Sequence, residues 1–131
     1  MSITFDKAFG VHQYTLGVRS RRAELLASNI ANADTPNYKA KDLDFKKALA
    51  SAMNGHDFRL LRTNERHIAG TGAFDPAVGY RIPDQPDTGD GNTVDMQTEK
   101  TRYMENGMRY EASVDFLNSK ISGLRKSITG Q

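Results

Sequence analysis

The chain has 131 residues, which favours a single domain, and its 37% hydrophobic residues indicate a core smaller than that of an ordinary globular domain. Its 18 basic and 16 acidic residues are evenly spread, so the composition does not indicate the one-sided basic surface of a nucleic-acid binder. The absence of cysteine excludes disulfides and thiolate metal sites, and no apolar run approaches the ~20 residues of a membrane span.

The first segment, from about Thr4 to Asn32, is predicted to be helical because its apolar residues recur with the period of an α-helix. These residues cover well over half of the helix circumference, whereas a surface helix usually shows an apolar stripe of ~100° or a little more. We therefore expect this helix to pack against more than one partner. The residues that we assign to this packing are Phe9, Leu16, Val18, Leu25, Leu26 and Ile30.

A polar, turn-forming segment follows this helix. Pro36 fixes the first dihedral angle of a turn over residues 35–38, and Asn37 tolerates the positive φ that a type II turn needs next. We expect the side chains of Asn29, Asn32 and Asp34 to cap carbonyl groups left free at the helix end. An ordinary helix C-cap would suffice locally, but the segment holds more polar and small residues than a cap requires.

The middle of the chain changes character. The stretch "DLDFKKALASAM" is predicted to form a short helix, capped by Asp42 or Asp44, with Phe45, Leu49 and Ala52 on one side. Residues 54–92 are rich in glycine and proline and lack sustained periodicity, so they are predicted to be irregular. Within them, "HDFRLLRT" and "VGYRI" each have the composition of a short strand.

The last segment, from about Val94 to Thr129, is predicted to be a long helix. Two rows of large side chains each repeat every seven residues, and together they give the 4-3 spacing of a coiled-coil seam. The regular part of the seam is shorter than the three to four heptads that make a coiled coil secure from sequence. The rows consist of Tyr103, Tyr110, Leu117 and Leu124, and of Val114, Ile121 and Ile128.

The sequence offers no arrangement of residues for catalysis. His12, His56 and His67 lack metal-ligand spacing, and His12 is interpreted as a packed or hydrogen-bonded interface residue. The stretch "GTGAFD" lacks the third glycine and the following lysine of a phosphate-binding loop. The basic "RSRR" at residues 19–22 indicates a solvated face or an anionic partner. We expect no enzyme activity, no cofactor and no metal site.

Two stretches carry a resemblance to a known family. "ASNIANADTPNYKAKDLDF" resembles the N-terminal signature of the bacterial flagellar rod, hook and hook-associated proteins, in which Asn-Ile-Ala-Asn leads into Thr-Pro-Gly-Tyr. The second half, from Tyr80 to Ile128, is similar to the proximal rod members of that family. One departure is Asn37, which stands where the family usually has glycine. Because asparagine also tolerates positive φ, we expect the turn to be kept.

The resemblance implies a structural subunit of the flagellar basal-body rod, located in the periplasm and exported without a cleaved signal peptide. Its terminal helices would pair as a coiled coil and assemble into an axial tube around the export channel. The implied partners are other rod subunits, the rod adaptor and the flagellar export gate, in homo- and hetero-oligomeric contacts without nucleic acid. The turn residues implied at subunit contacts are Asn29, Ala31, Asn32, Asp34, Thr35, Pro36, Asn37 and Tyr38.

The expected fold is therefore mainly α, with long N- and C-terminal helices paired as a coiled coil. We divide the single axial domain into an N-terminal helix (1–33), the turn and short helix (34–53), an irregular middle (54–92) and a C-terminal helix (93–131). The alternative function from another class is a soluble helical-hairpin adaptor or export chaperone that does not polymerise.

Overall fold

A computed structural model describes residues 8–54 and 77–130 of the chain. The described part is mainly helical, as the sequence predicts, with one long C-terminal helix and a small sheet. The predicted strand "HDFRLLRT", His56 and His67 lie outside the described residues. In chain order the elements are α2 (His12–Ala31), β1 (Lys41–Leu43), α3 (Phe45–Asn54), β2 (Val78–Tyr80) and α4 (Met96–Thr129).

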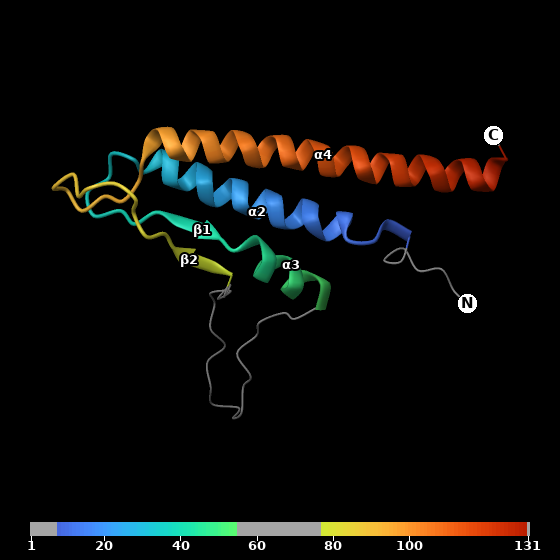
Figure 1. The fold of residues 1–131 in the computed structure, drawn as a ribbon, viewed down its shortest axis with the longest axis horizontal. Coiled ribbons are helices and arrows are strands. Elements are labelled where there is room, and N and C mark those ends of the chain that lie inside the picture. The colour runs from blue at the N-terminus through green and yellow to red at the C-terminus, as the bar shows by residue number, and fades with distance from the viewer. Residues whose placement is uncertain (1–7, 55–76, 131) are drawn as a thin grey trace, which may run out of the picture.

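Helix α2 lies between two layers. Helix α4 runs antiparallel along one side of it, and α3 with the β1–β2 pair lies along the other side (Figure 1). Because α2 has neighbours on both sides, the prediction that it packs against more than one partner is confirmed. The small core consists of Val18, Leu43, Ala48 and Ala77, with Leu25, Phe45, Ala52 and Val78 packed against it.

The beginning of the first helix differs from the prediction. Helix α2 begins at His12, and a turn at residues 10–11 separates it from helical residues 8–9, while the predicted start near Thr4 lies outside the described residues. Gly10 has a φ of +60°, a conformation that glycine adopts without steric cost and that interrupts the helix. Phe9, assigned to helix packing, is half-buried just before this turn.

The predicted short helix is present, and of its two predicted caps, Asp42 and Asp44, the structure uses Asp44. Helix α3 begins at Phe45, and the side chain of Asp44 accepts a hydrogen bond of 3.2 Å from the backbone N–H of Lys47, which is an N-cap. The residues just before it form strand β1, which we did not expect. Strand β1 pairs antiparallel with β2, in the register Lys41–Tyr80, Asp42–Gly79 and Leu43–Val78. The strand predicted in "VGYRI" is thus confirmed.

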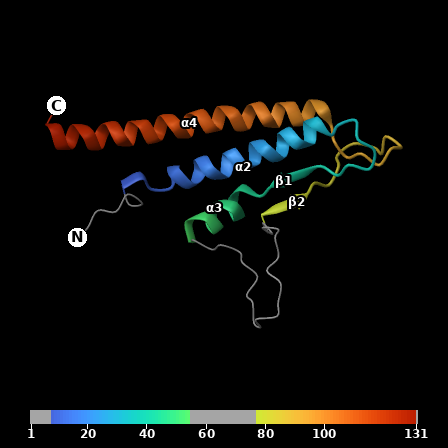
Figure 2. The ribbon, with the colours of Figure 1, turned by 180° about the vertical axis from the view of Figure 1, so that it is seen from behind.

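The long helix α4 agrees with the prediction to within two residues at its start. Asp95 is its N-cap, and its carboxylate accepts from the backbone N–H groups of Gln97 and Thr98 at 3.0 and 3.4 Å. Hydrogen bonds from the Thr98 side chain and backbone lower the pKa of Asp95. The other end of α4 extends past the beginning of α2, so its last turns lie alone beside no other described element (Figure 2).

The side of α4 that contacts α2 is polar. Glu99 and Asn106 are only 1% and 2% exposed, and both bond to α2: Glu99 to Asn29, and Asn106 to the carbonyl of Arg19. Ser113, seven residues further on, is also buried and continues this row. The apolar rows predicted as the seam lie beside it on the helix surface, and several of their residues are exposed. Pairing of α2 and α4 as a coiled coil stays a prediction.

Candidate functional site

The turn after α2 has the predicted form. Asn37 has a φ of +62° and is the one non-glycine residue with positive φ among those that the structure describes. The backbone N–H of Tyr38 donates to the carbonyl of Thr35 at 3.3 Å, which closes a four-residue turn. Because Pro36 holds a negative φ at the second position, positive φ at the third position defines a type II turn. This prediction is confirmed.

A residue that sequence reasoning missed closes the helix end. The side-chain N–H₂ of Asn92 donates to the carbonyls of Asn32, Ala33 and Thr35 at 3.0, 2.8 and 2.9 Å. Asn32 itself caps the carbonyl of Ser28 at 2.8 Å, as expected. Asp34 is exposed and makes no cap contact within the described ranges, so the main cap comes from Asn92, about sixty positions away.

The chain after the turn is held by the segment that leads into α4. The N–H of Asn37 donates to the carbonyl of Asp90 at 2.9 Å, and the N–H of Thr93 donates to the carbonyl of Tyr38 at 3.0 Å. Gly91 lies so close that a Cβ there would be 2.5 Å from the Asn37 Oδ1. A side chain at residue 91 would displace the Asn37 carboxamide, and the φ of +72° there also favours glycine.

We expected Asn29 to cap its own helix. Its side chain instead closes the free edge of strand β1. Its carboxamide donates to the carbonyl of Lys41 at 2.7 Å and accepts from the N–H of Lys41 at 3.0 Å. These are the two bonds that a neighbouring strand would make. Asn29 is 0% exposed, and it also donates to Glu99 Oε2 at 3.0 Å. One amide therefore joins α2, β1 and α4.

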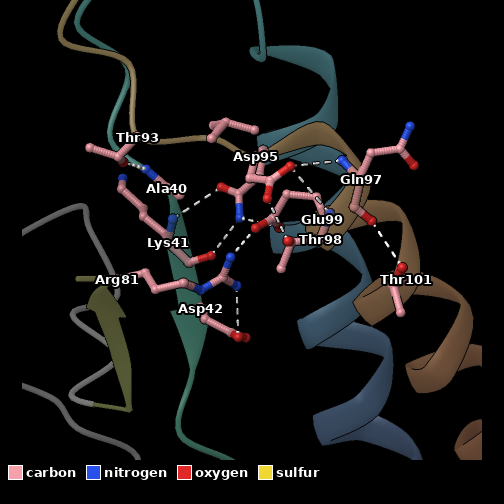
Figure 3. Close-up of polar contacts among 12 residues, drawn as sticks. Ala40, Lys41, Asp42, Arg81, Thr93, Asp95, Gln97, Thr98, Glu99 and Thr101 are labelled. Carbon is pink, nitrogen blue, oxygen red and sulfur yellow. Dashed lines mark hydrogen bonds and ion pairs between the residues drawn. The ribbon is translucent and has the colours of Figure 1, made fainter. Parts of the chain in front are cut away.

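Four charged side chains continue this arrangement. Arg22 on α2 forms a bidentate pair with Asp42 on β1, at 2.9 and 3.0 Å. Arg81 donates to Asp42 Oδ2 at 2.8 Å, an oxygen that Arg22 also contacts. Arg81 also pairs with Glu99 on α4 (Figure 3). We call Arg22, Asn29, Asp42, Arg81 and Glu99 the polar junction. The basic "RSRR" indicated a solvated face or an anionic partner, and for Arg22 this partner is the Asp42 carboxylate of the same chain.

The electrostatics of the polar junction follow from these bonds. Burial alone would raise the pKa of Asp42, but hydrogen bonds from Arg22, the Leu43 N–H and Arg81 outweigh it and lower that pKa. The pKa of Arg22 is raised, chiefly by its hydrogen bond to Asp42. Both shifts favour the charged forms, so the pair is ionised at neutral pH and ties α2 to β1.

The predicted contact residues of the turn divide by exposure. Asn29 is buried, Asn32 and Tyr38 are half-buried, and the Tyr38 hydroxyl lies 3.1 Å from Ser28 Oγ. The rest of the set is exposed and available to another chain; it consists of Ala31, Asp34, Thr35, Pro36 and Asn37.

The predicted helix-packing residues also divide. On α2, Val18 and Leu26 are buried, while Leu16, Leu25 and Ile30 are half-buried. On α4, Val114 and Leu117 are half-buried. The remaining members of the two rows expose 39% of their surface or more, reaching 86% for Ile128; they are Tyr103, Tyr110, Ile121, Leu124 and Ile128. Their packing role stays a prediction.

The arrangement is suited to holding a shape and to contacting other proteins. Within residues 8–54 and 77–130, no group of three or more His, Asp or Glu side chains is placed to hold a metal ion. No helix in the same part of the chain is long and apolar enough to cross a membrane. His12 packs its ring against Phe116, with centroids 5.7 Å apart, which agrees with an interface role. The fold is therefore a helical hairpin that buried polar contacts join to a small sheet.

Comparison with known proteins identifies the family of this chain. The family model described as "Flagella basal body rod protein" matches residues 11–39, which span α2 and the turn. A flagellar basal body rod protein FlgB of Aeromonas hydrophila is 53% identical over 131 residues, covering 100% of this chain and 99% of the relative. FlgB of Salmonella typhimurium is 40% identical, with 95% of each chain covered, and FlgB of Escherichia coli is 42% identical, with 91% covered. The chain therefore belongs to the family of the flagellar basal body rod protein FlgB.

Proposed function

We propose that this protein is a structural subunit of the proximal rod of the bacterial flagellar basal body. It polymerises through its terminal helices into the axial tube that transmits torque and surrounds the export channel. Its neighbours are other rod subunits, the rod adaptor and the export gate, and it reaches the periplasm without a cleaved signal peptide. It performs no catalysis.

The observation that carries the proposal is the C-terminal end of α4. All of residues 118–129 are exposed, and three large apolar side chains lie on one side of this stretch: Ile121, Leu124 and Ile128. We call residues 118–129 the helical overhang. A helix that has no packing partner is marginal in water, so an apolar side of this length favours a second chain as its partner.

The alternative is a soluble helical-hairpin adaptor or export chaperone that binds one partner and does not polymerise. The antiparallel arrangement of α2 and α4 suits either function. Membership in the rod family favours the subunit, because the relatives are named as rod proteins over nearly their full length.

Fractionation of cells separates the two functions. A strain that lacks the gene is complemented with an epitope-tagged chain, and intact basal bodies are purified and probed for the tag. We expect the tagged chain in the basal bodies, and we expect motility to be lost in the uncomplemented strain. Tagged chain found only in the soluble fraction, in cells that swim, would contradict the rod function and support the adaptor.

A further inference from the structure

A notch of about 280 Å³ opens between α2 and α4 on the side away from the sheet and α3. Its walls are formed by small residues, Ser20 and Ala23 on α2 and Gly107 on α4, with Tyr103 and Tyr110 on either side of Gly107. A Cβ at Gly107 would meet nothing within 4 Å, so the space above this glycine is open. The notch has the form of a hole that accepts a side chain from another helix.

A polar atom at the notch lacks a partner. Asn106 is 2% exposed, and its Oδ1 accepts no hydrogen bond within the described part of the chain. The guanidinium of the neighbouring Arg19 lies over the Phe45 ring of α3, 4.6 Å from its centroid. Buried polar atoms are normally satisfied, and each one left unpaired costs stability. An acceptor left open at the notch therefore points to a donor that arrives from outside the described residues.

The helical overhang has the complementary chemistry. Its apolar row needs a covered position, and its charged residues are all basic, namely Lys120, Arg125 and Lys126. It also carries hydrogen-bond donors of the kind that Asn106 Oδ1 lacks, on Asn118, Ser119 and Ser122. At the notch, the exposed Glu111 forms no ion pair within residues 8–54 and 77–130. This carboxylate would attract the basic side chains of the overhang.

We propose that the notch between α2 and α4 receives the helical overhang of a second copy of this chain. The proposal rests on the proposed rod function and adds to it which surfaces of two copies meet. Because the notch and the overhang are different surfaces of one chain, the contact is head-to-tail. A head-to-tail contact repeats from copy to copy and builds a ring or a helical filament, whereas a symmetric contact would stop at a dimer.

The alignment of the notch and the apolar row along one side of α4 supports the same contact. At 3.6 residues per turn, Tyr103, Gly107 and Tyr110 lie on the same side of α4 as the row formed by Ile121, Leu124 and Ile128. One continuous side of the helix therefore presents the notch near its middle and the apolar row near its end. Two copies that are shifted along their axes bring the row of one against the notch of the other.

Filling the notch tests the proposal. Gly107→Leu puts a large side chain into open space and replaces a helix-interior glycine, so the isolated chain should keep its fold. Assembly should fall roughly tenfold or more, measured as purified rods per cell, because the added side chain overpacks the contact. The matched control is Gly17→Leu, which adds the same side chain at another open, helix-interior glycine that lies on α2, outside the notch and the overhang. Normal rods from a folded Gly107→Leu chain would overturn the proposal.

Crosslinking tests it independently of any effect on folding. The chain contains no cysteine, so introduced cysteines report only on the positions chosen. Two differently tagged chains, Tyr110→Cys and Leu124→Cys, are expressed together, and basal bodies are treated with a mild oxidant. We expect a crosslink that carries both tags. Crosslinks of either variant only to itself indicate a symmetric contact, and crosslinks only to other proteins indicate a different partner; either result overturns the proposal.

The two proposals fail differently. If the tagged wild-type chain is absent from basal bodies, the rod function itself is wrong. If the chain is present in rods, but Gly107→Leu assembles normally and the cysteine pair gives no mixed crosslink, the rod function stands and the notch contact is wrong.

Discussion

The two ends of α4 differ in their burial and in their contacts. Its beginning enters the polar junction, where Glu99 is 1% exposed and bonded to Asn29 and Arg81. Its end is the helical overhang, where every residue is exposed and Ile128 is exposed by 86%. One end is completed by the chain's own residues, and the other presents apolar surface without a described partner. A rod subunit needs both, because the first gives a defined shape and the second gives a contact.

Removing a charge from the polar junction should have the largest effect on the isolated chain. Glu99→Ala removes one of the two carboxylates that pair with Arg81 and one of the two acceptors of the Asn29 carboxamide. Loss of one partner of a buried pair costs roughly 3–5 kcal/mol in the free energy of unfolding. Urea unfolding followed by circular dichroism measures it, with the exposed Glu111→Gln as control. A loss below about 1 kcal/mol, which is typical of surface ion pairs, would show that the junction is not a structural tie.

A pair of identical substitutions compares the two ends of the helical layer directly. Leu26 is 0% exposed, so Leu26→Ala should lower the free energy of unfolding by about 2–5 kcal/mol. Leu124→Ala in the overhang should change it by less than about 0.5 kcal/mol, because the side chain is 40% exposed. Leu124→Ala should nevertheless reduce rod assembly strongly. Equal losses of stability in the isolated chain would mean that the overhang is already packed before assembly.

The turn provides an effect of intermediate size. Asn37→Val should lower the free energy of unfolding by roughly 1–2 kcal/mol, because a β-branched side chain resists the positive φ of +62°. Asn37→Gly should be close to neutral, and Pro36→Ala should lie between the two. Thermal unfolding of the three variants measures the order. If Asn37→Val unfolds at the wild-type temperature, the positive φ has no energetic consequence.

The smallest expected effect is a dependence of stability on pH. The pKa of Asp42 is lower in the folded chain than in the unfolded chain, so its ionised form stabilises the fold. This stabilisation is fully present above the ordinary pKa of an aspartate, ~3.9, and is lost as the pH falls through the lowered pKa. The free energy of unfolding should decline more steeply with acid in the wild type than in Asp42→Asn. Asp84→Asn, at an exposed position, should follow the wild type.

Local signals were enough to predict much of this fold. The Pro36–Asn37 turn follows from two residues whose allowed φ values are restricted, and α4 follows from a long periodic pattern that starts after a capping aspartate. Strand β1 was missed because its three residues are too few to show alternation. Its neighbour Asp44, one of the two predicted caps, does cap α3, so the prediction of this helix is confirmed with that cap.

The long-range contacts were beyond a local reading. Asn29 carries the same side chain whether it caps its own helix or closes the edge of β1, and only the position of Lys41 decides between the two. Asn92 lies in a loop whose sequence does not indicate the three carbonyl groups that its side chain binds. The side of α4 that contacts α2 was also not predicted, because a search for apolar heptads does not detect Glu99 and Asn106.

The position of Asn92 has a consequence for how the chain folds. The bonds that close the end of α2 join residues 57 to 60 positions apart, and the Asn29–Glu99 bond spans 70 positions. Contacts of such sequence separation carry a large loop-closure entropy and form late. A chain that emerges with its N-terminus first therefore lacks the cap on α2 and the polar junction until residues 92–99 have followed. Folding that waits for these residues would suit the unfolded export of the proposed rod subunit.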